Sequence, residues 1–155
     1  MAYGASAQAF DNKRSPGEMI SCKMANELVY KGTLMDVQAD GYVGQVGDTD
    51  ALIFAGVSAE TKDNSGGSDG DLNIDIYVTG IFEFKTTGAS IAWVGTLAYA
   101  DLGNEDAGQR VLNTTGGTNP VCVGRIVEVV SATRVRVCID GYAFTAGAAP
   151  NGIHS

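Results

Sequence analysis

Apolar residues occupy every second position of residues 72–84, a pattern that few folds can accommodate. The series is interrupted once, at Gly80, and comprises Leu72, Ile74, Ile76, Val78, Phe82 and Phe84. Because successive side chains of a strand point to opposite faces, this pattern predicts one long β-strand with an apolar face. An amphipathic helix would need apolar residues three and four positions apart, which this stretch lacks. A glycine on the apolar face predicts a bend or bulge at Gly80.

The remaining apolar stretches are short and separated by turn signals, with no helical pattern between them. The clearest is a hairpin, in which residues 121–130 lead through two turn residues into residues 133–139. Alternation in its second arm predicts one apolar face and one face that carries Arg134, Arg136 and Cys138. Further strands are expected in residues 28–35, 42–46, 52–59 and 111–112, and before Asp101. This pattern predicts an all-β fold, a small single-domain barrel or sandwich, and leaves the strand order open.

The two ends of the chain differ in composition from its centre. We expect an N-terminal arm in residues 1–27, a β-rich core domain in residues 28–140, and an irregular Gly/Ala-rich tail in residues 141–155. Tyr3 and Phe10 are isolated aromatic residues in the arm. Two interpretations remain open: a terminus without fixed structure, or an extended arm that becomes ordered on a neighbouring subunit and fills pockets with these aromatics. Residues 19–27 fit either a helical turn or a strand.

Length and charge restrict the classes of function. A chain of 155 residues is long enough for one domain with a substantial core. Its 18 acidic and 10 basic residues give a net charge of −8, which disfavours nonspecific binding to nucleic acid. No apolar run approaches the ~20 residues of a membrane helix. The first residues do not resemble a secretory signal, so we expect a protein made in the cytosol without a membrane partner.

The cysteines favour reduced thiols over a structural role. Cys22, Cys122 and Cys138 are odd in number and have no CxxC spacing, so neither a disulfide framework nor a zinc site is expected. One alternative remains open, because Cys122 and Cys138 could face each other across the predicted hairpin and form a disulfide.

No residue pattern predicts catalysis or a cofactor. The single histidine, His154, is next to the last residue, where no packing would hold it for nucleophilic catalysis. Residues 69–75 alternate oxygen-bearing side chains as a calcium loop does, but Ile74 and Gly80 stand where an EF-hand needs Gly and Glu. A phosphate-binding glycine motif is absent. The hairpin arginines are expected to pair with acids such as Glu128. We therefore expect a protein that is not an enzyme and holds neither cofactor nor metal.

The order of several segments resembles a known family. These segments are residues 52–59, a Gly-rich acidic loop, residues 74–84, 91–92, 97–101, 123–129 and 134–137. Their order and spacing are similar to those of the small capsid decoration (cement) proteins of tailed bacteriophages, over roughly residues 28–140. The resemblance implies a β-tulip-like domain that forms a homotrimer and has no catalytic residues. It also implies binding to the outer capsid surface of the virion at three-fold or quasi-three-fold positions, where the trimer bridges major capsid protein subunits and stabilises the shell.

Candidate partner-binding residues come from the arm and from the polar face of residues 72–84. We expect Tyr3, Phe10 and Arg14 to contact the major capsid protein, and Tyr77 and Ile81 to contact neighbouring copies in the trimer.

Two alternative functions belong to other classes of protein. A tail, fibre or host-surface module that binds glycans would use exposed aromatics in loops, with Trp93 and Tyr99 as the candidates. A trimeric β-fold nucleotide hydrolase would need a phosphate-binding motif, which the sequence lacks.

Overall fold

The computed structural model describes residues 18–48, 53–103, 107–115 and 118–141, and nearly all of the regular secondary structure in these residues is strand. The prediction of an all-β fold is confirmed. The elements are β1 (Met19–Lys23), β2 (Leu28–Val29), β3 (Leu34–Val37), β4 (Val43–Gln45), β5 (Ile53–Ser58), β6 (Lys62–Asp63), β7 (Asn73–Tyr77), β8 (Thr79–Lys85), β9 (Leu97–Ala100), β10 (Val111–Leu112), β11 (Cys122–Ser131) and β12 (Arg134–Asp140), with two 3₁₀ helices, η1 (Ile91–Trp93) and η2 (Ala107–Gln109).

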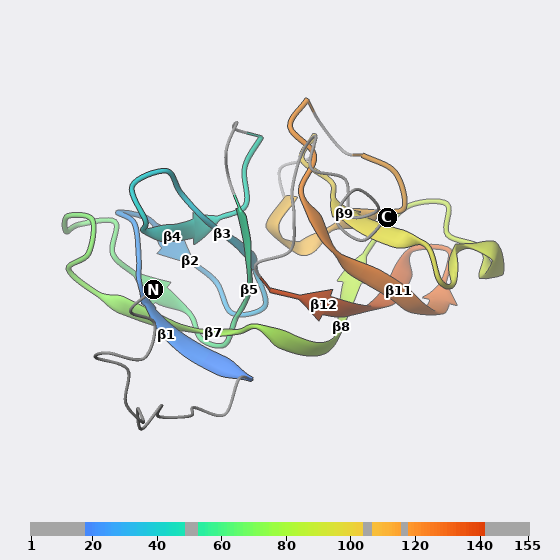
Figure 1. Cartoon of the computed structure of the whole chain (residues 1–155), viewed down its shortest axis with the longest axis horizontal. Coiled ribbons are helices and arrows are strands. Elements are labelled where there is room, and N and C mark those ends of the chain that lie inside the picture. Colours follow the sequence, from blue (N-terminus) through green and yellow to red (C-terminus); the bar gives the residue numbers. More distant parts are fainter. Residues whose placement is uncertain (1–17, 49–52, 104–106, 116–117, 142–155) are drawn as a thin grey trace, which may run out of the picture.

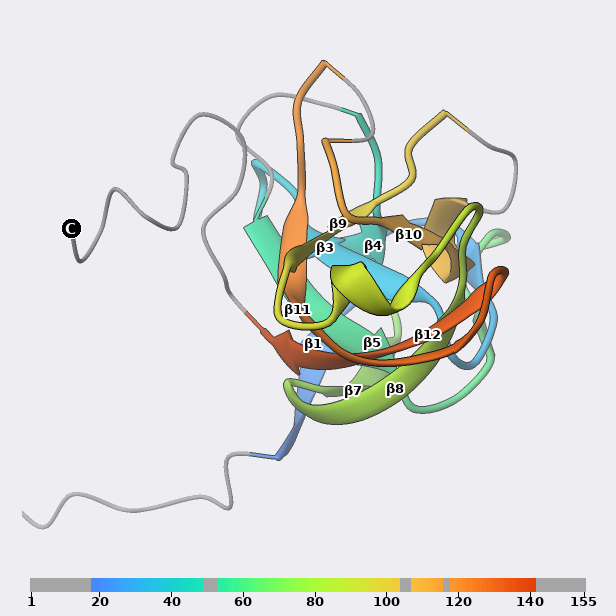
Figure 2. The same ribbon diagram turned by 90° about the vertical axis from the view of Figure 1, so that its right-hand side faces the viewer.

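Two five-stranded sheets make up the domain (Figure 1). The first sheet has the order β1-β7-β5-β3-β4, and the second has the order β10-β9-β11-β12-β8. Neighbouring strands within each sheet pair antiparallel, and β2 and β6 form a separate short ribbon. Figure 2 shows that the second sheet is strongly curled. The predicted hairpin is confirmed as β11 and β12, with Val135, Val137 and Ile139 buried.

The prediction of one long strand over residues 72–84 is wrong, because these residues form β7 and β8 in different sheets. The chain bends at Val78. The N–H of Val78 donates to the Glu18 carbonyl (2.9 Å) while its own carbonyl accepts from the N–H of Gly141 (2.8 Å). Glu18 and Gly141 lie on opposite sides of the backbone at Val78. The N–H and the C=O of this residue therefore point in opposite directions, whereas both would point the same way in a regular strand. Gly80 follows with a φ of 135°, a conformation that other residues rarely adopt.

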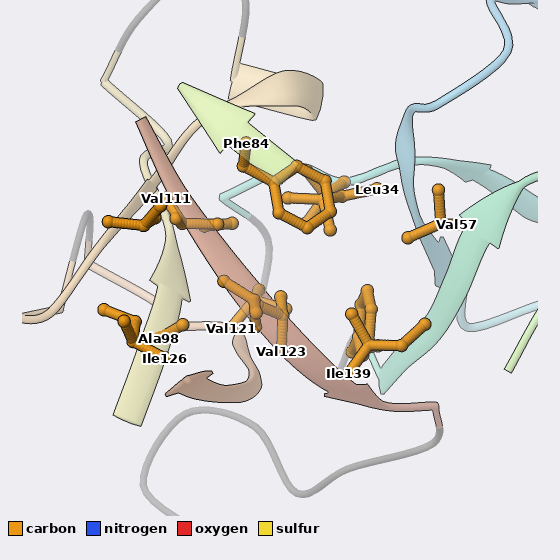
Figure 3. Packing of buried hydrophobic residues seen from close by; sticks show 14 residues of the cluster. Leu34, Val57, Phe84, Ala98, Val111, Val121, Val123, Ile126 and Ile139 are labelled. Carbon is orange, nitrogen blue, oxygen red and sulfur yellow. The ribbon is translucent and has the colours of Figure 1, made fainter. Parts of the chain in front are cut away.

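The bend divides the alternating apolar residues between two cores. The main core lies between the two sheets, where Leu34 and Val57 of the first sheet approach Phe84 and Ile139 of the second (Figure 3). A smaller core is formed by buried residues that include Ile74 and Ile76. The even-numbered side chains therefore remain the apolar set on both sides of the bend, but β7 and β8 bury them in different clusters.

The first described residues belong to the folded domain. β1 pairs with β7 over its whole length, from Met19 opposite Tyr77 to Lys23 opposite Asn73. Met24, directly after β1, is fully buried in the smaller core. Residues 19–23 are thus a strand, and the folded unit extends into residues 1–27, where we expected an arm.

Candidate interaction surface

The outer face of the second sheet carries an exposed apolar side chain next to a thiol. In the strand register, Ile81 of β8 lies opposite Cys138 of β12, and Cys138 lies opposite Arg125 of β11. Opposed residues of an antiparallel pair have their side chains on the same face, so these three form one row across three strands. Ile81 is 60% exposed, and Cys138 and Arg125 are exposed as well. We call Ile81, Cys138 and the ion pairs beside them the outer patch.

A ladder of ion pairs forms the second row of the outer patch. Glu83 of β8, Arg136 of β12 and Glu128 of β11 are opposed across the three strands. Arg136 lies 3.6 Å from Glu83 (Nε to Oε1) and 3.2 Å from Glu128 (Nη1 to Oε1). Arg134 also contacts Glu83, at 3.6 Å between Nη1 and Oε2. The prediction that hairpin arginines pair with Glu128 is confirmed for Arg136. Because these charges neutralise one another, Ile81 and Cys138 are the residues of the two rows that gain most from being covered.

Arg125 joins this face to the loop that follows β8. Its Nη1 donates to the carbonyl of Gly95 at 2.8 Å, and the N–H of Gly95 donates to the carbonyl of Ile126, also at 2.8 Å. The same loop exposes two apolar side chains, Ile91 (79% exposed) and Val94 (44% exposed). Exposed apolar side chains therefore occur on the η1 loop as well as in the outer patch.

The structure describes two of the five predicted partner-binding residues. Ile81 is exposed in the outer patch. Tyr77 is half-buried, and its ring packs against Phe82 with the ring centroids 5.5 Å apart. Tyr77 and Ile81 therefore do not form one exposed surface, because the chain bends between them. Tyr3, Phe10 and Arg14 lie outside the described residues.

From the sequence we placed Cys138 on the polar face of the hairpin but did not name it as a partner-binding residue, and we missed Ile91. Cys138 had a signal, because its alternation with Val137 and Ile139 predicts an outward side chain. No sequence signal marked Ile91, because it lies in a turn where apolar residues follow no regular spacing.

The aromatic residues proposed for glycan binding are not exposed loop residues: Trp93 packs against the main core, and Tyr99 is a half-buried residue of β9. Burial raises the pKa of the Tyr99 phenol.

The acidic loop before β7 is held by hydrogen bonds within the protein. The buried amide of Asn64 donates to the carbonyls of Ser68 (2.9 Å) and Ala25 (3.2 Å). Asp71 accepts from the N–H of Ser68 at 2.9 Å, and Asp69 accepts from the N–H of Asn26 at 2.8 Å. The oxygen-rich pattern that resembles a calcium loop thus fixes the shape of a turn. Nowhere in the described part of the chain do three His, Cys, Asp or Glu side chains gather as metal ligands.

Asp36 is the one described carboxyl group with a strongly raised pKa. It is fully buried on β3, and burial raises its pKa to about 7, with a smaller contribution from the nearby charge of Glu27. Its Oδ2 accepts a hydrogen bond from the N–H of Gly47 (3.0 Å), which acts in the opposite direction. Oδ1 has no partner among the described residues. A proton on Asp36 would therefore relieve the burial of a charge.

The two cysteines of the hairpin are not joined by a disulfide. Cys138 lies opposite Arg125, whereas Cys122 lies nearer the start of β11 and is opposite Tyr99 of β9. Cys122 is buried and Cys138 is exposed, so their side chains are on different faces, and both thiols are free. Burial raises the pKa of Cys122, which makes its thiol less reactive.

Comparisons with known proteins give the chain no family. No protein-family model matches the sequence, and a search of curated proteins gives no significant match. Within the described ranges, no helix has the length and apolar character needed to cross a membrane. The function must therefore be inferred from the sequence and from the geometry of the outer patch.

Proposed function

We propose that this protein is a capsid decoration protein of a tailed bacteriophage. In this proposal three copies form a homotrimer that binds the outer surface of the head and bridges major capsid protein subunits. The proposal is supported by the order of segments over residues 28–140 and by the all-β domain, which is the architecture that the resemblance implies. The observation that carries it is the outer patch, where Ile81 and Cys138 lie exposed beside charges that are already paired.

The outer patch has the properties of a surface that associates with protein. Covering an apolar side chain contributes about 25 cal/mol for each Å² removed from water. Arg134 and Arg136 already contact Glu83, so a partner that covers them does not leave either guanidinium unpaired. We assign this patch to contacts between copies, and the arm residues Tyr3, Phe10 and Arg14 to contacts with the capsid.

Stabilisation of a shell by such a protein follows from linkage. A ligand that contacts several capsid subunits binds the assembled shell and not the separate subunits, so its binding free energy adds to the stability of the shell. Joining three weak binding sites in one trimer raises the effective concentration of the second and third sites once the first is bound. The protein therefore needs no active site to perform this function.

Sedimentation with purified shells tests this function. The protein should pellet with expanded, undecorated phage heads and should saturate at a fixed number of copies per shell. It should not pellet with intact bacterial cells. Pelleting with cells but not with heads would favour the alternative, a tail, fibre or host-surface module that binds glycans. The packing of Trp93 against the core argues against that alternative, since a glycan platform needs an exposed aromatic face.

A further inference from the structure

The ribbon of β2 and β6 carries the only aromatic side chain of the described ranges that is exposed. This residue, Tyr30, directly follows β2 and is 59% exposed. Val29 before it is fully buried, and Leu28 is exposed. Because successive side chains of an extended chain point to opposite sides, Leu28 and Tyr30 share the outward side of the ribbon. Asp63 of β6 is opposite Leu28 in the register and is exposed as well. We call Leu28, Tyr30 and Asp63 the ribbon patch.

The carboxylate of Asp63 has no basic partner among the described residues. Its Oδ1 accepts hydrogen bonds from the hydroxyl and from the N–H of Ser65, the latter at 2.9 Å. These two hydrogen bonds lower the pKa of Asp63, so the carboxylate is charged at neutral pH. Lys62 beside it contacts Glu60 instead, at 3.7 Å between Nζ and Oε1. The ribbon patch therefore combines two apolar side chains with one negative charge that no described side chain neutralises.

Arg125 supplies the opposite charge beside the outer patch. It lies in one row with Cys138 and Ile81 across β11, β12 and β8. Its Nη1 donates to the carbonyl of Gly95, and no carboxylate in the described part of the chain pairs with it. The other arginines of the outer patch already contact glutamates. This row therefore combines an apolar side chain and a thiol with one positive charge that no described acid neutralises.

A three-fold ring joins two different surfaces of each copy. In such a ring one contact is repeated head to tail, so a surface that meets a neighbour meets a different surface and not its own equivalent. The outer patch, which we assign to contacts between copies, therefore needs a second surface as its partner. The ribbon patch lies on the other half of the domain. In Figure 1, β2 lies on the left with the first sheet, whereas β11 and β12 lie to the right.

The other large apolar side chains that are exposed in the described part are less suited to this contact. Four of them lie on β11 or on the η1 loop beside it, and so on the same sheet as the outer patch; they are Ile91, Val94, Val127 and Val130. The remaining three lie on separate segments of the first sheet; they are Met19, Ile53 and Leu72. Single exposed apolar residues are common on protein surfaces and do not indicate a contact.

We propose that the ribbon patch of one copy packs on the outer patch of the next copy. In this contact Asp63 faces Arg125, and Tyr30 covers Ile81 and Cys138. The inference rests on the proposed trimer and names the second half of its contact. A tyrosine ring brings a large apolar surface with few rotatable bonds, and tyrosines are frequent at the centres of interfaces. Each of the two charges finds a partner across the contact, so neither is covered alone.

Cross-linking of the full chain through the native Cys138 tests this contact. In Leu28→Cys, a short bismaleimide should join the introduced thiol to Cys138 of the next copy. Denaturing gels should then show covalent dimers and trimers and no larger species, because the ring closes at three copies. Leu72→Cys is the matched control, since Leu72 is 37% exposed and Leu28 is 38% exposed. Leu28→Cys should give about tenfold more covalent trimer than this control, and Leu28→Cys/Cys138→Ser should give none.

Charge reversal tests the pair of Asp63 and Arg125 independently. Asp63→Lys and Arg125→Glu should each raise, by about tenfold or more, the concentration at which half of the protein is trimeric in sedimentation. The double variant should return to within about threefold of the wild type, because the two charges are exchanged and still attract. Asp40→Lys is the control and should leave the trimer unchanged. Asp40 is exposed and, like Asp63, accepts the N–H of the second residue after it.

The outcomes separate this contact from the proposed function. If the wild type is trimeric and Leu28→Cys cross-links no better than Leu72→Cys, the contact is overturned and the trimer stands. A double charge variant that dissociates more easily than either single variant would also overturn it. A wild type that stays monomeric would overturn the trimer and this contact together. Pelleting of the same samples with phage heads is measured separately, so that loss of the contact is not mistaken for loss of capsid binding.

Discussion

Ile81 of β8 lies directly opposite Cys138 of β12, and both side chains are exposed on the outer face of the second sheet. The neighbouring row consists of Glu83 and Arg136, whose charges are 3.6 Å apart. An apolar pair beside a neutralised pair is an arrangement suited to being covered by protein. The outer patch is therefore the part of the described surface on which the proposed trimer can be tested most simply.

Ile81→Asp should convert the proposed trimer to monomers. A carboxylate at this position would be buried without a partner in a trimer contact, at a cost of several kcal/mol, while the exposed position keeps the monomer folded. Sedimentation equilibrium measures the change in mass. Thr79→Asp is the matched control, because Thr79 is exposed on the same strand and the same face but has no apolar side chain to bury. A trimeric Ile81→Asp protein would remove Ile81 from the contact between copies.

The thiols should react at very different rates. A maleimide should label Cys138, which is exposed, and should leave Cys122 unmodified in the folded protein, because that thiol is buried and its pKa is raised. Formation of the trimer should slow labelling of Cys138, so the wild type should react more slowly than Ile81→Asp at the same pH. Mass spectrometry of digested protein identifies the labelled site, and Cys138→Ser is the control. Equal labelling rates for Cys138 in both proteins would contradict a trimer contact at the outer patch.

The stability of the protein should fall as the pH rises from about 4 to 7, because of Asp36. Its pKa is about 7 in the folded protein and 3.8 as its ordinary value. The folded state therefore binds a proton that the unfolded state has lost over this range, and each step in pH weakens folding until Asp36 is ionised. The full difference corresponds to at most about 4 kcal/mol in the free energy of unfolding, and the contribution of this group levels off about one pH unit above its folded pKa. Urea unfolding between pH 4 and pH 8.5 measures it.

Asp36→Asn should remove this pH dependence and make the protein more stable than the wild type at pH 8, by roughly 1–3 kcal/mol. The amide carbonyl can still accept the N–H of Gly47, and no charge is buried. Asp40→Asn is the control, since Asp40 is exposed in the turn between β3 and β4 and should leave the slope with pH unchanged. If the free energy of unfolding of the Asp36→Asn protein fell with pH as steeply as that of the wild type, another group would be responsible for the pH dependence.

Gly124→Ala should destabilise the domain by about 2 kcal/mol or more. Gly124 has a φ of 151° within β11, and a Cβ there would lie 2.1 Å from the carbonyl oxygen of Cys138. Backbone atoms of the β11–β12 hairpin would have to move apart. Gly66→Ala is the matched control, because a Cβ on Gly66 meets nothing within 4 Å. The urea concentrations at the unfolding midpoints of the Gly124→Ala and Gly66→Ala proteins measure the difference in stability. Equal midpoints would contradict the close approach of β11 to β12.

Local patterns predicted most of the strands, but not β1, β6 or the distribution of the strands between the two sheets. The β11–β12 hairpin was predictable because alternation and a short turn are both local signals, and Val135 and Val137 are buried as expected. The division of residues 72–84 was not, since the bend depends on Glu18 and Gly141, each about 60 residues from Val78. The alternating pattern is the same whether the strand continues straight or crosses to another sheet.

An exposed apolar residue could be predicted from the sequence only where it interrupts the polar face of a strand. Ile81 stands out between Thr79 and Glu83, and it is exposed. Tyr77 has the same position in the alternation, but the bend brings its ring against Phe82. The residues next to Asp36 in the sequence did not predict its burial. Its surroundings are Gly47, Glu27 and β5, which pack on β3 only in the folded chain.

Imaging of expanded, undecorated phage heads mixed with the purified protein tests the central claim most directly. The account predicts additional three-lobed density on the outer surface at three-fold positions, present with the wild type and lost with Ile81→Asp. Heads that remain bare at saturating concentrations of a folded wild-type protein would contradict it.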